Sequence, residues 1–368
     1  MRTFHRAEAP VGAKTLDGVW YTSPSVFEVE QDRIFGGSWI AAGREEQVPA
    51  AGDYFLVEVA GESLIVTRDT RGTLHAFYNV CRHRGTRLCT EARGHFKSSI
   101  QCPYHAWTYG TDGSLQVARN MEGAEDFKCA DYPLREARLG IFEGFIFVCL
   151  DENASSFAQT FAPLDGRFTA WNLPALRVAR RIEYDLAANW KLIFQNYSEC
   201  YHCPVVHPQL EKLSPSESGR NDFTDGAFLG GYSLLRDGKS LAVSGNSTRK
   251  PFPRLDAHEQ QRAYYYTIFP SLLLSLHPDY AMAHYVMPVA VDHSKVICEW
   301  LFAEEEIARA DFDGNEVIEF WDLTNRQDWH VNELTQQGVA SRAYTPGPYA
   351  RQEGLLHAFD RHYLHHMT

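Results

Sequence analysis

The 368-residue chain, with 44% hydrophobic residues, is long enough for two domains with sizeable cores. Its formal net charge of −12 argues against a general nucleic-acid binder, because such proteins need a basic face to neutralise phosphates. No apolar run reaches the roughly 18 residues of a membrane span, and the first residues lack the apolar segment of a signal peptide. We therefore expect a cytoplasmic protein of enzyme size that binds neither nucleic acid nor membranes.

The cysteines are too sparse to predict a disulfide framework, since such frameworks are typical of small secreted domains. We expect each of them to be a metal ligand or a buried free thiol. They stand at positions 81, 89, 102, 129, 149, 200, 203 and 298.

Residues 1–40 predict an N-terminal arm followed by a helix, because apolar side chains recur every three or four positions in residues 26–35. From about residue 40 to 150 the pattern changes to short alternating runs divided by Gly and Pro, which predict a small all-β domain. The expected strands of this part lie at residues 53–59, 62–68, 74–80 and 144–150.

Two Cys-His pairs lie inside this β domain. The first pair is Cys81 and His83, and the second is Cys102 and His105. Eighteen residues lie between His83 and Cys102. Two thiolates and two imidazoles can form a structural zinc site. They can also hold a [2Fe–2S] cluster in which two cysteines bind one iron and two histidines the other, an arrangement that raises the reduction potential above that of an all-cysteine cluster.

The chain beyond residue 156 predicts further strands and two long helical segments. Residues 210–255 are polar and rich in Gly and Ser, which predicts mobile loops. The expected helices cover residues 189–196 and 316–338, and Gly338 suits a helix C-cap. The expected strands cover residues 178–186, 263–269, 272–276, 280–286 and 295–302.

A second motif lies in residues 196–207. His202 and His207 stand five positions apart and could converge on one divalent ion. Glu199 lies about one helical turn before His202, and Asn196 adds a carboxamide to the same segment. Taken alone, the two histidines could equally be hydrogen-bonded residues of the core. The two Cys-His pairs upstream favour a metal site, because an electron-carrying cluster implies a group that consumes electrons.

The first motif resembles the Rieske motif in its oxygenase branch, on the residues CRHRG at 81–85 and CPYHAW at 102–107. The resemblance implies a Rieske non-haem iron oxygenase alpha subunit, the terminal oxygenase, of class α+β. It implies an all-β Rieske [2Fe-2S] domain at 41–155 and a helix-grip catalytic domain, an antiparallel sheet with helices, at 156–368. Residues 1–40 would pack with the catalytic domain.

The same resemblance implies a mononuclear Fe(II) held by His202, His207 and one carboxylate. We expect this carboxylate to be Asp328, which precedes a Gln-Gly pair by about ten residues as in the family pattern, and Asp322 is its main competitor. Glu199 would be a catalytic residue together with Asn196. In similar enzymes the residue at the position of Glu199 bridges the iron-site histidine to a cluster histidine of the neighbouring subunit, which implies a homotrimer.

At this position similar enzymes usually carry Asp, and the Glu found here resembles the glycine betaine, choline and stachydrine monooxygenase branch. The implied reaction uses O2 and electrons from an NAD(P)H-dependent flavin/iron-sulfur reductase to remove an N-methyl group from, or hydroxylate, a small quaternary ammonium compound. One alternative is an aromatic-ring hydroxylating oxygenase, and another is a Rieske electron carrier without catalysis.

Aromatic residues on the expected strands are candidates for substrate binding, because aromatic faces attract trimethylammonium groups. We assign this role to Tyr264, Tyr266 and Trp300, with core packing as the alternative for each. Strand alternation places Tyr264 and Tyr266 on one face and Tyr265 on the other, so at most one of these faces meets the substrate.

Overall fold

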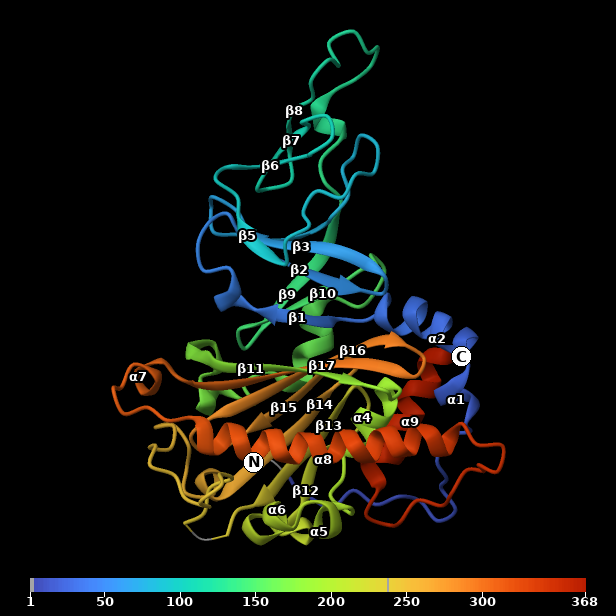
Figure 1. Ribbon diagram of the computed structural model, residues 1–368, viewed down its shortest axis with the longest axis vertical. Helices are drawn as coiled ribbons and strands as arrows, with labels where there is room; N and C mark the ends of the chain where they lie inside the picture. Colours follow the sequence, from blue (N-terminus) through green and yellow to red (C-terminus); the bar gives the residue numbers. More distant parts are fainter. Residues whose placement is uncertain (1–2, 237) are drawn as a thin grey trace. The chain divides into compact units, whose positions relative to one another are not determined.

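The computed structural model describes residues 3–236 and 238–368 (Figure 1). The chain divides into two compact units, one formed by Gln31–Asp165 and the other by Met1–Glu30 together with Gly166–Thr368. The division falls ten residues before and ten residues after the expected boundaries at 40 and 155. No described helix combines the length and the apolar character that crossing a membrane requires.

The unit of residues 31–165 is built from antiparallel strands. A seven-stranded sheet has the order β1-β10-β9-β4-β3-β2-β5, and a three-stranded sheet has the order β6-β7-β8. Four of these strands were expected from alternation, while β5 to β8 have only three residues each, too few for a pattern. The elements are β1 Ile40–Arg44, β2 Asp53–Val59, β3 Glu62–Arg68, β4 Leu74–Tyr78, β5 Arg93–His95, β6 Ser99–Gln101, β7 Thr108–Gly110, β8 Leu115–Val117, β9 Glu136–Phe142, β10 Phe145–Cys149 and α3 Phe157–Phe161.

The other unit contains a seven-stranded antiparallel sheet of order β11-β17-β16-β15-β14-β13-β12. Its strands are β11 Leu176–Leu186, β12 Arg220–Asp225, β13 Phe228–Leu234, β14 Arg262–Ile268, β15 Leu272–Leu276, β16 Ala281–Ala290 and β17 His293–Ala303. Its helices are α1 Val19–Thr22, α2 Pro24–Glu30, α4 Trp190–Tyr197, α5 Cys203–Val206, α6 Pro208–Leu213, α7 Glu304–Ile307, α8 Asn315–Val339 and α9 Gly354–Met367. An antiparallel sheet with helices is the expected catalytic-domain architecture.

Helix α8 runs across this sheet (Figure 1). Its buried side chains recur at intervals of three or four positions, from Val317 through Trp321 and Trp329 to Val339, as expected for a helix with one face on a sheet. Strand β15 is buried at all its residues. The core therefore lies between sheet and helix, and polar residues of α8 near its middle can reach the same interior.

Residues 210–255 include the expected loops but also contain regular elements. This stretch begins with the end of α6 and contains the paired strands β12 and β13. At least one of its glycines is required by the sheet. A Cβ atom on Gly231 of β13 would lie 2.0 Å from the carbonyl oxygen of Arg220 in β12. The close approach of two strands explains this glycine, which the sequence pattern attributes to a loop.

Candidate functional site

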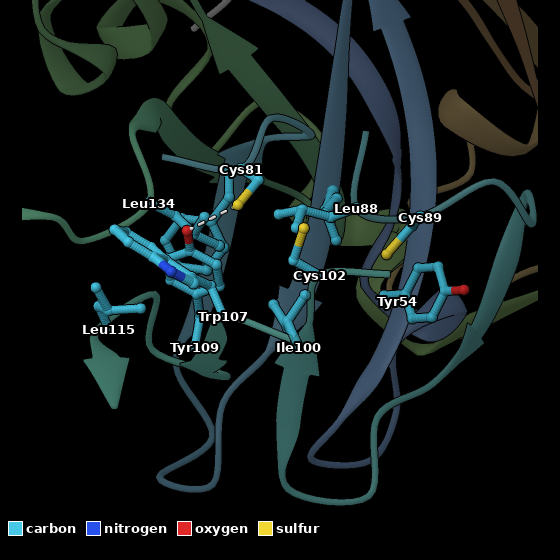
Figure 2. Close-up of a cluster of buried hydrophobic side chains, with 12 residues drawn as sticks. Tyr54, Cys81, Leu88, Cys89, Ile100, Cys102, Trp107, Tyr109, Leu115 and Leu134 are labelled. Atoms are coloured by element: carbon cyan, nitrogen blue, oxygen red, sulfur yellow. Dashed lines mark hydrogen bonds between the residues drawn. The ribbon is translucent and has the colours of Figure 1, made fainter. Parts of the chain in front are cut away.

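The two Cys-His pairs come together in the unit of residues 31–165. Cys81 and Cys102 are each 2% exposed and belong to a buried cluster of side chains (Figure 2). The rings of His83 and His105 have centroids 4.7 Å apart, and His83 also stacks on Trp107 at 4.8 Å. The sequence-predicted cluster residues thus occupy one place in the fold.

The two loops that carry these residues have the same backbone turn. The amide of Gly85 donates to the carbonyl of Cys81 at 3.0 Å, and the amide of Ala106 donates to that of Cys102 at 3.1 Å. Both turns need a left-handed residue, with φ of +74° at Gly85 and +56° at Ala106. Glycine adopts this conformation freely, whereas alanine does so at a cost of about 1–2 kcal/mol. The fold therefore holds the second loop in an unfavourable conformation, which is typical of functional sites.

The chemistry of these four side chains fits an iron–sulfur cluster. Burial raises the pKa of the Cys81 thiol, so its thiolate needs a cation beside it. Burial, followed by the nearby His105 and Arg84, lowers the pKa of His83, which keeps this imidazole neutral and able to bind a metal. The Nδ1 atom of His105 is buried without a hydrogen-bond partner in the described structure. This atom could therefore bind an iron of the cluster.

The second motif follows helix α4, whose N-cap is Asn189. The side chain of Asn189 accepts a hydrogen bond from the amide of Lys191 at 3.0 Å, which satisfies a free N–H group of the first turn. The helix ends at Tyr197, and the next residues form a loop and the short helix α5. His202 and His207 flank α5 as its N-cap and C-cap, and the backbone leaves the helical conformation at His207 (φ −124°, ψ 61°). This departure lets the two histidines face one point, since continuous helix would place residues five positions apart on different sides.

His202, His207 and Asp328 form a group in which one ligand atom from each lies within 4.8 Å of the others. The Nε2 atom of His207 is 2.8 Å from Oδ1 of Asp328, and Nε2 of His202 is 3.3 Å from the same oxygen. Asp328 comes from the middle of α8. The structure thus brings the three predicted ligands together from two distant parts of the sequence.

The charges of this group fit a divalent metal. Burial lowers the pKa of His202, but Asp328 and Glu199 outweigh it and raise the value to about 10. Burial raises the pKa of Asp328, but hydrogen bonds from His202 and His207 bring it below its ordinary value. A proton therefore occupies the place that a cation would take, and metal binding would displace it. Two imidazoles and one carboxylate are the donor set of non-haem Fe(II) oxygenases.

The residues around the three candidate ligands orient them. Glu199 Oε1 lies 2.5 Å from Nδ1 of His202, and Oε1 of Gln327 lies 2.8 Å from Nδ1 of His207. These contacts leave Nε2 of each ring for a metal. The role of Gln327 was missed in the sequence, although its position next to Asp328 was a usable signal.

Asp322, the competing carboxylate, lies elsewhere. It accepts a hydrogen bond from the hydroxyl of Tyr184 at 2.7 Å and pairs with Arg326 at 2.9 Å. It is not part of the group formed by His202 and His207.

A cavity of about 520 Å³ opens beside these residues within the same unit. Its described lining includes Asn196, Glu199, His202, His207 and Asp328. A volume of this size suits a small organic molecule.

The structure corrects the predicted substrate-binding aromatics. Tyr264, Tyr266 and Trp300 are almost completely buried in the core and are not among the described residues that line the cavity. Tyr265, on the opposite face of strand β14, lines it. The three predicted residues therefore pack in the core, which was the alternative for each of them. The face of β14 that meets the cavity is the one that carries Tyr265, not the one that carries Tyr264 and Tyr266.

The structure also corrects the expectation of free thiols at Cys200 and Cys203, which form a disulfide bond around His202. The remaining cysteines of the described chain are free. No disulfide framework could be expected from the sequence, because the bond joins cysteines only three positions apart.

Comparison with known proteins defines the class. Residues 38–132 match the Rieske [2Fe-2S] domain, and residues 173–368 match the catalytic domain of the ring hydroxylating alpha subunit. The chain therefore belongs to the Rieske non-haem iron oxygenases as an alpha, or oxygenase, subunit. It is an oxidoreductase with a Rieske [2Fe-2S] domain and a mononuclear-iron domain that uses O2, and it needs a reductase partner and a small-molecule substrate.

Within this family the chain is similar to enzymes of quaternary ammonium compounds. It is 31% identical to the glycine betaine monooxygenase oxygenase subunit of Chromohalobacter salexigens, over 92% of this chain and 82% of that protein. It is 30% identical to the carnitine monooxygenase oxygenase subunit of Escherichia coli K12, over 91% and 87%. The structure of the quaternary ammonium Rieske monooxygenase CntA in complex with L-carnitine matches with a TM-score of 0.77 and 27% identity, over 97% and 96%.

Proposed function

We propose that this protein oxidises a betaine-like quaternary ammonium compound, most simply by hydroxylating an N-methyl carbon, after which the product breaks down to formaldehyde and the demethylated amine. His202, His207 and Asp328 would hold the mononuclear iron, which when bound supplies open positions for O2 activation. The cluster that passes electrons to it would be held by Cys81, His83, Cys102 and His105.

The observation that carries this proposal is an aromatic wall in the cavity of the three candidate ligands. Tyr197, Tyr265 and Trp321 all line the cavity. The ring centroids of Tyr197 and Tyr265 are 6.1 Å apart, and those of Tyr265 and Trp321 are 6.3 Å apart. Each such ring can attract a trimethylammonium group by roughly 0.5–2 kcal/mol.

A neutral histidine beside this wall is compatible with a cation. Burial lowers the pKa of His284 to about 4, so this cavity residue stays neutral and does not repel an ammonium group.

Glu199 would serve as the junction for electrons. Its Oε1 atom already holds His202 at 2.5 Å, and a carboxylate can accept a further N–H bond from a cluster histidine of a neighbouring subunit. This role requires a closed ring of subunits, for which we propose a homotrimer. The NAD(P)H-dependent flavin/iron-sulfur reductase would supply electrons in the cytoplasm.

The proposal predicts formaldehyde release from an N-methylated substrate. Reconstituted protein, a reductase of this type and NADH should be incubated with betaines, tertiary amines and aromatic acids, and formaldehyde and hydroxylated products should be assayed. We expect formaldehyde from at least one betaine, and none from the His202→Ala variant with its cluster intact. Product from aromatic acids alone would instead support ring hydroxylation.

A further inference from the structure

Building on the function proposed above, we propose that Arg6 binds an anionic group of the substrate, so that the cavity prefers zwitterions to simple quaternary cations. The aromatic wall and Arg6 would then hold the two ends of one molecule.

The N-terminal arm is fixed to the sheet of its own unit. His5 pairs with Asn221 of strand β12 through two backbone hydrogen bonds of 2.9 and 2.6 Å. The amide of Ala7 donates to Oδ1 of Asn221 at 3.1 Å, and the amide of Ala9 donates to the carbonyl of Arg351 at 2.8 Å. These contacts on both sides hold Arg6, which lines the cavity.

Arg6 is the only arginine or lysine among the described lining residues. Its guanidinium donates to the backbone carbonyl of Glu217. Within the described chain it forms no ion pair with a carboxylate. A guanidinium has five N–H donors in a planar fork that matches a carboxylate. One carbonyl partner leaves donors for a ligand.

The register of the sheet separates Arg6 from the cation-binding wall. Asn221, Gly231, Tyr265 and Ser275 are paired in one row across β12, β13, β14 and β15. Neighbouring strands lie about 4.8 Å apart, so this row spans roughly 14 Å. At one end of the row, Asn221 pairs with His5 of the arm. At the other end, the hydroxyl of Ser275 contacts the hydroxyl of Tyr197 at 2.8 Å.

The row also leaves a passage between these two ends. All four of its residues line the cavity, and directly paired residues share one face of a sheet. Gly231 adds no side chain to the row between Asn221 and Tyr265. A substrate with its ammonium group at Tyr265 would extend its other end along this row toward Arg6.

The test compares a trimethylammonio carboxylic acid with its uncharged carboxamide. Their dissociation constants should be measured calorimetrically on the iron-loaded holoenzyme. Losing a charge-assisted hydrogen bond predicts that Arg6→Gln weakens acid binding about tenfold to hundredfold. Carboxamide binding should change less than about twofold, and Arg6→Lys should recover part of the loss because the positive charge remains.

Arg351→Gln is the matched control. This residue pairs with Glu8 of the arm at 2.8 Å but is not among the described lining residues, so the variant loses the same charge and an arm contact without changing the cavity. It should bind both compounds as the wild type does. Equal weakening of acid and carboxamide by Arg6→Gln, or no change, would overturn the role of Arg6. Formaldehyde release by the wild type is scored separately, so selective binding without demethylation would keep the anion site and overturn the proposed reaction.

Discussion

Two aspartates of helix α8 show how contacts distinguish a candidate ligand from a structural residue. Asp328 meets both His202 and His207, whereas Asp322 meets Tyr184 and Arg326. Residue types and spacing in the sequence leave both open. The choice follows from which side of the helix faces the loop after α4, and this depends on packing.

This difference predicts separate outcomes for two variants. Asp328→Ala should lose the mononuclear iron and all turnover, while the two irons and the visible absorption of the cluster remain. Asp322→Ala, the control on the same helix, should keep all of its iron. Iron analysis together with visible spectroscopy checks both. If the first variant keeps its iron and the second loses it, the ligand is Asp322.

Single residues also mark the limit of sequence-based prediction. The four candidate cluster residues and the two candidate iron-site histidines could be proposed from the sequence, because metal ligands require particular residue types at particular spacings. Tyr265 could not be distinguished from Tyr264 and Tyr266, because alternation defines two faces but not which of them meets the cavity. Arg6 lies on an arm whose place is fixed by a strand more than two hundred positions away.

At the scale of elements, helices α2, α4 and α9 share a buried polar network. Lys191 and Glu30 are fully buried and form an ion pair at 2.5 Å. Asp360 of α9 accepts hydrogen bonds from Gln195 at 2.7 Å and from Tyr349 at 2.6 Å. Gln195 directly precedes the cavity residue Asn196, so the network supports the helix that leads into the candidate iron site.

The buried carboxyl group of Asp360 predicts a pH dependence of stability. Burial raises its pKa to about 7, above the unfolded value of about 3.9. The folded state therefore binds the extra proton between these values. This proton binding stabilises the folded state fully below about pH 4. The contribution is lost as the pH rises to 7, which lowers the free energy of unfolding by up to about 4 kcal/mol.

Asp360→Asn should remove this dependence while keeping a side chain of the same shape. Its free energy of unfolding, relative to the wild type, should rise between pH 4 and pH 7 in denaturant titrations. Asp225→Asn is the control, because that exposed carboxylate pairs with Arg361 of the same helix and its loss should give no comparable trend. Parallel curves for Asp360→Asn and the wild type would contradict the assignment.

Elements with strong patterns were predictable. The expected helix 316–338 corresponds to α8, and strands 53–59, 62–68 and 272–276 have the observed bounds. The network of α2, α4 and α9 was not predictable, because its members lie up to 333 positions apart and polar residues carry no periodic signal for mutual burial.

At the scale of the whole molecule, the central question is how electrons reach the mononuclear iron. The proposed homotrimer predicts that two inactive chains can complement each other. Cys102→Ala chains lack a complete cluster, and His202→Ala chains lack a complete iron site. Co-expressed with distinguishable tags and purified as mixed oligomers, they should regain part of the wild-type turnover, because an intact cluster of one chain can serve an intact iron site of another.

Each variant purified alone should remain inactive, which controls for residual activity. Inactive mixed oligomers with both metals loaded would show that electrons must pass within one chain. A monomeric wild type in light-scattering measurements would also contradict the trimer.

The pairing of the N-terminal arm with strand β12 has one more consequence. β12 is the last strand in the order of its sheet, and His5 pairs with Asn221 on its outer side. Unpaired strand edges are templates for strand pairing between molecules. We therefore expect the arm to help protect the protein from aggregation, and a shortened chain without it to form intermolecular sheets more readily.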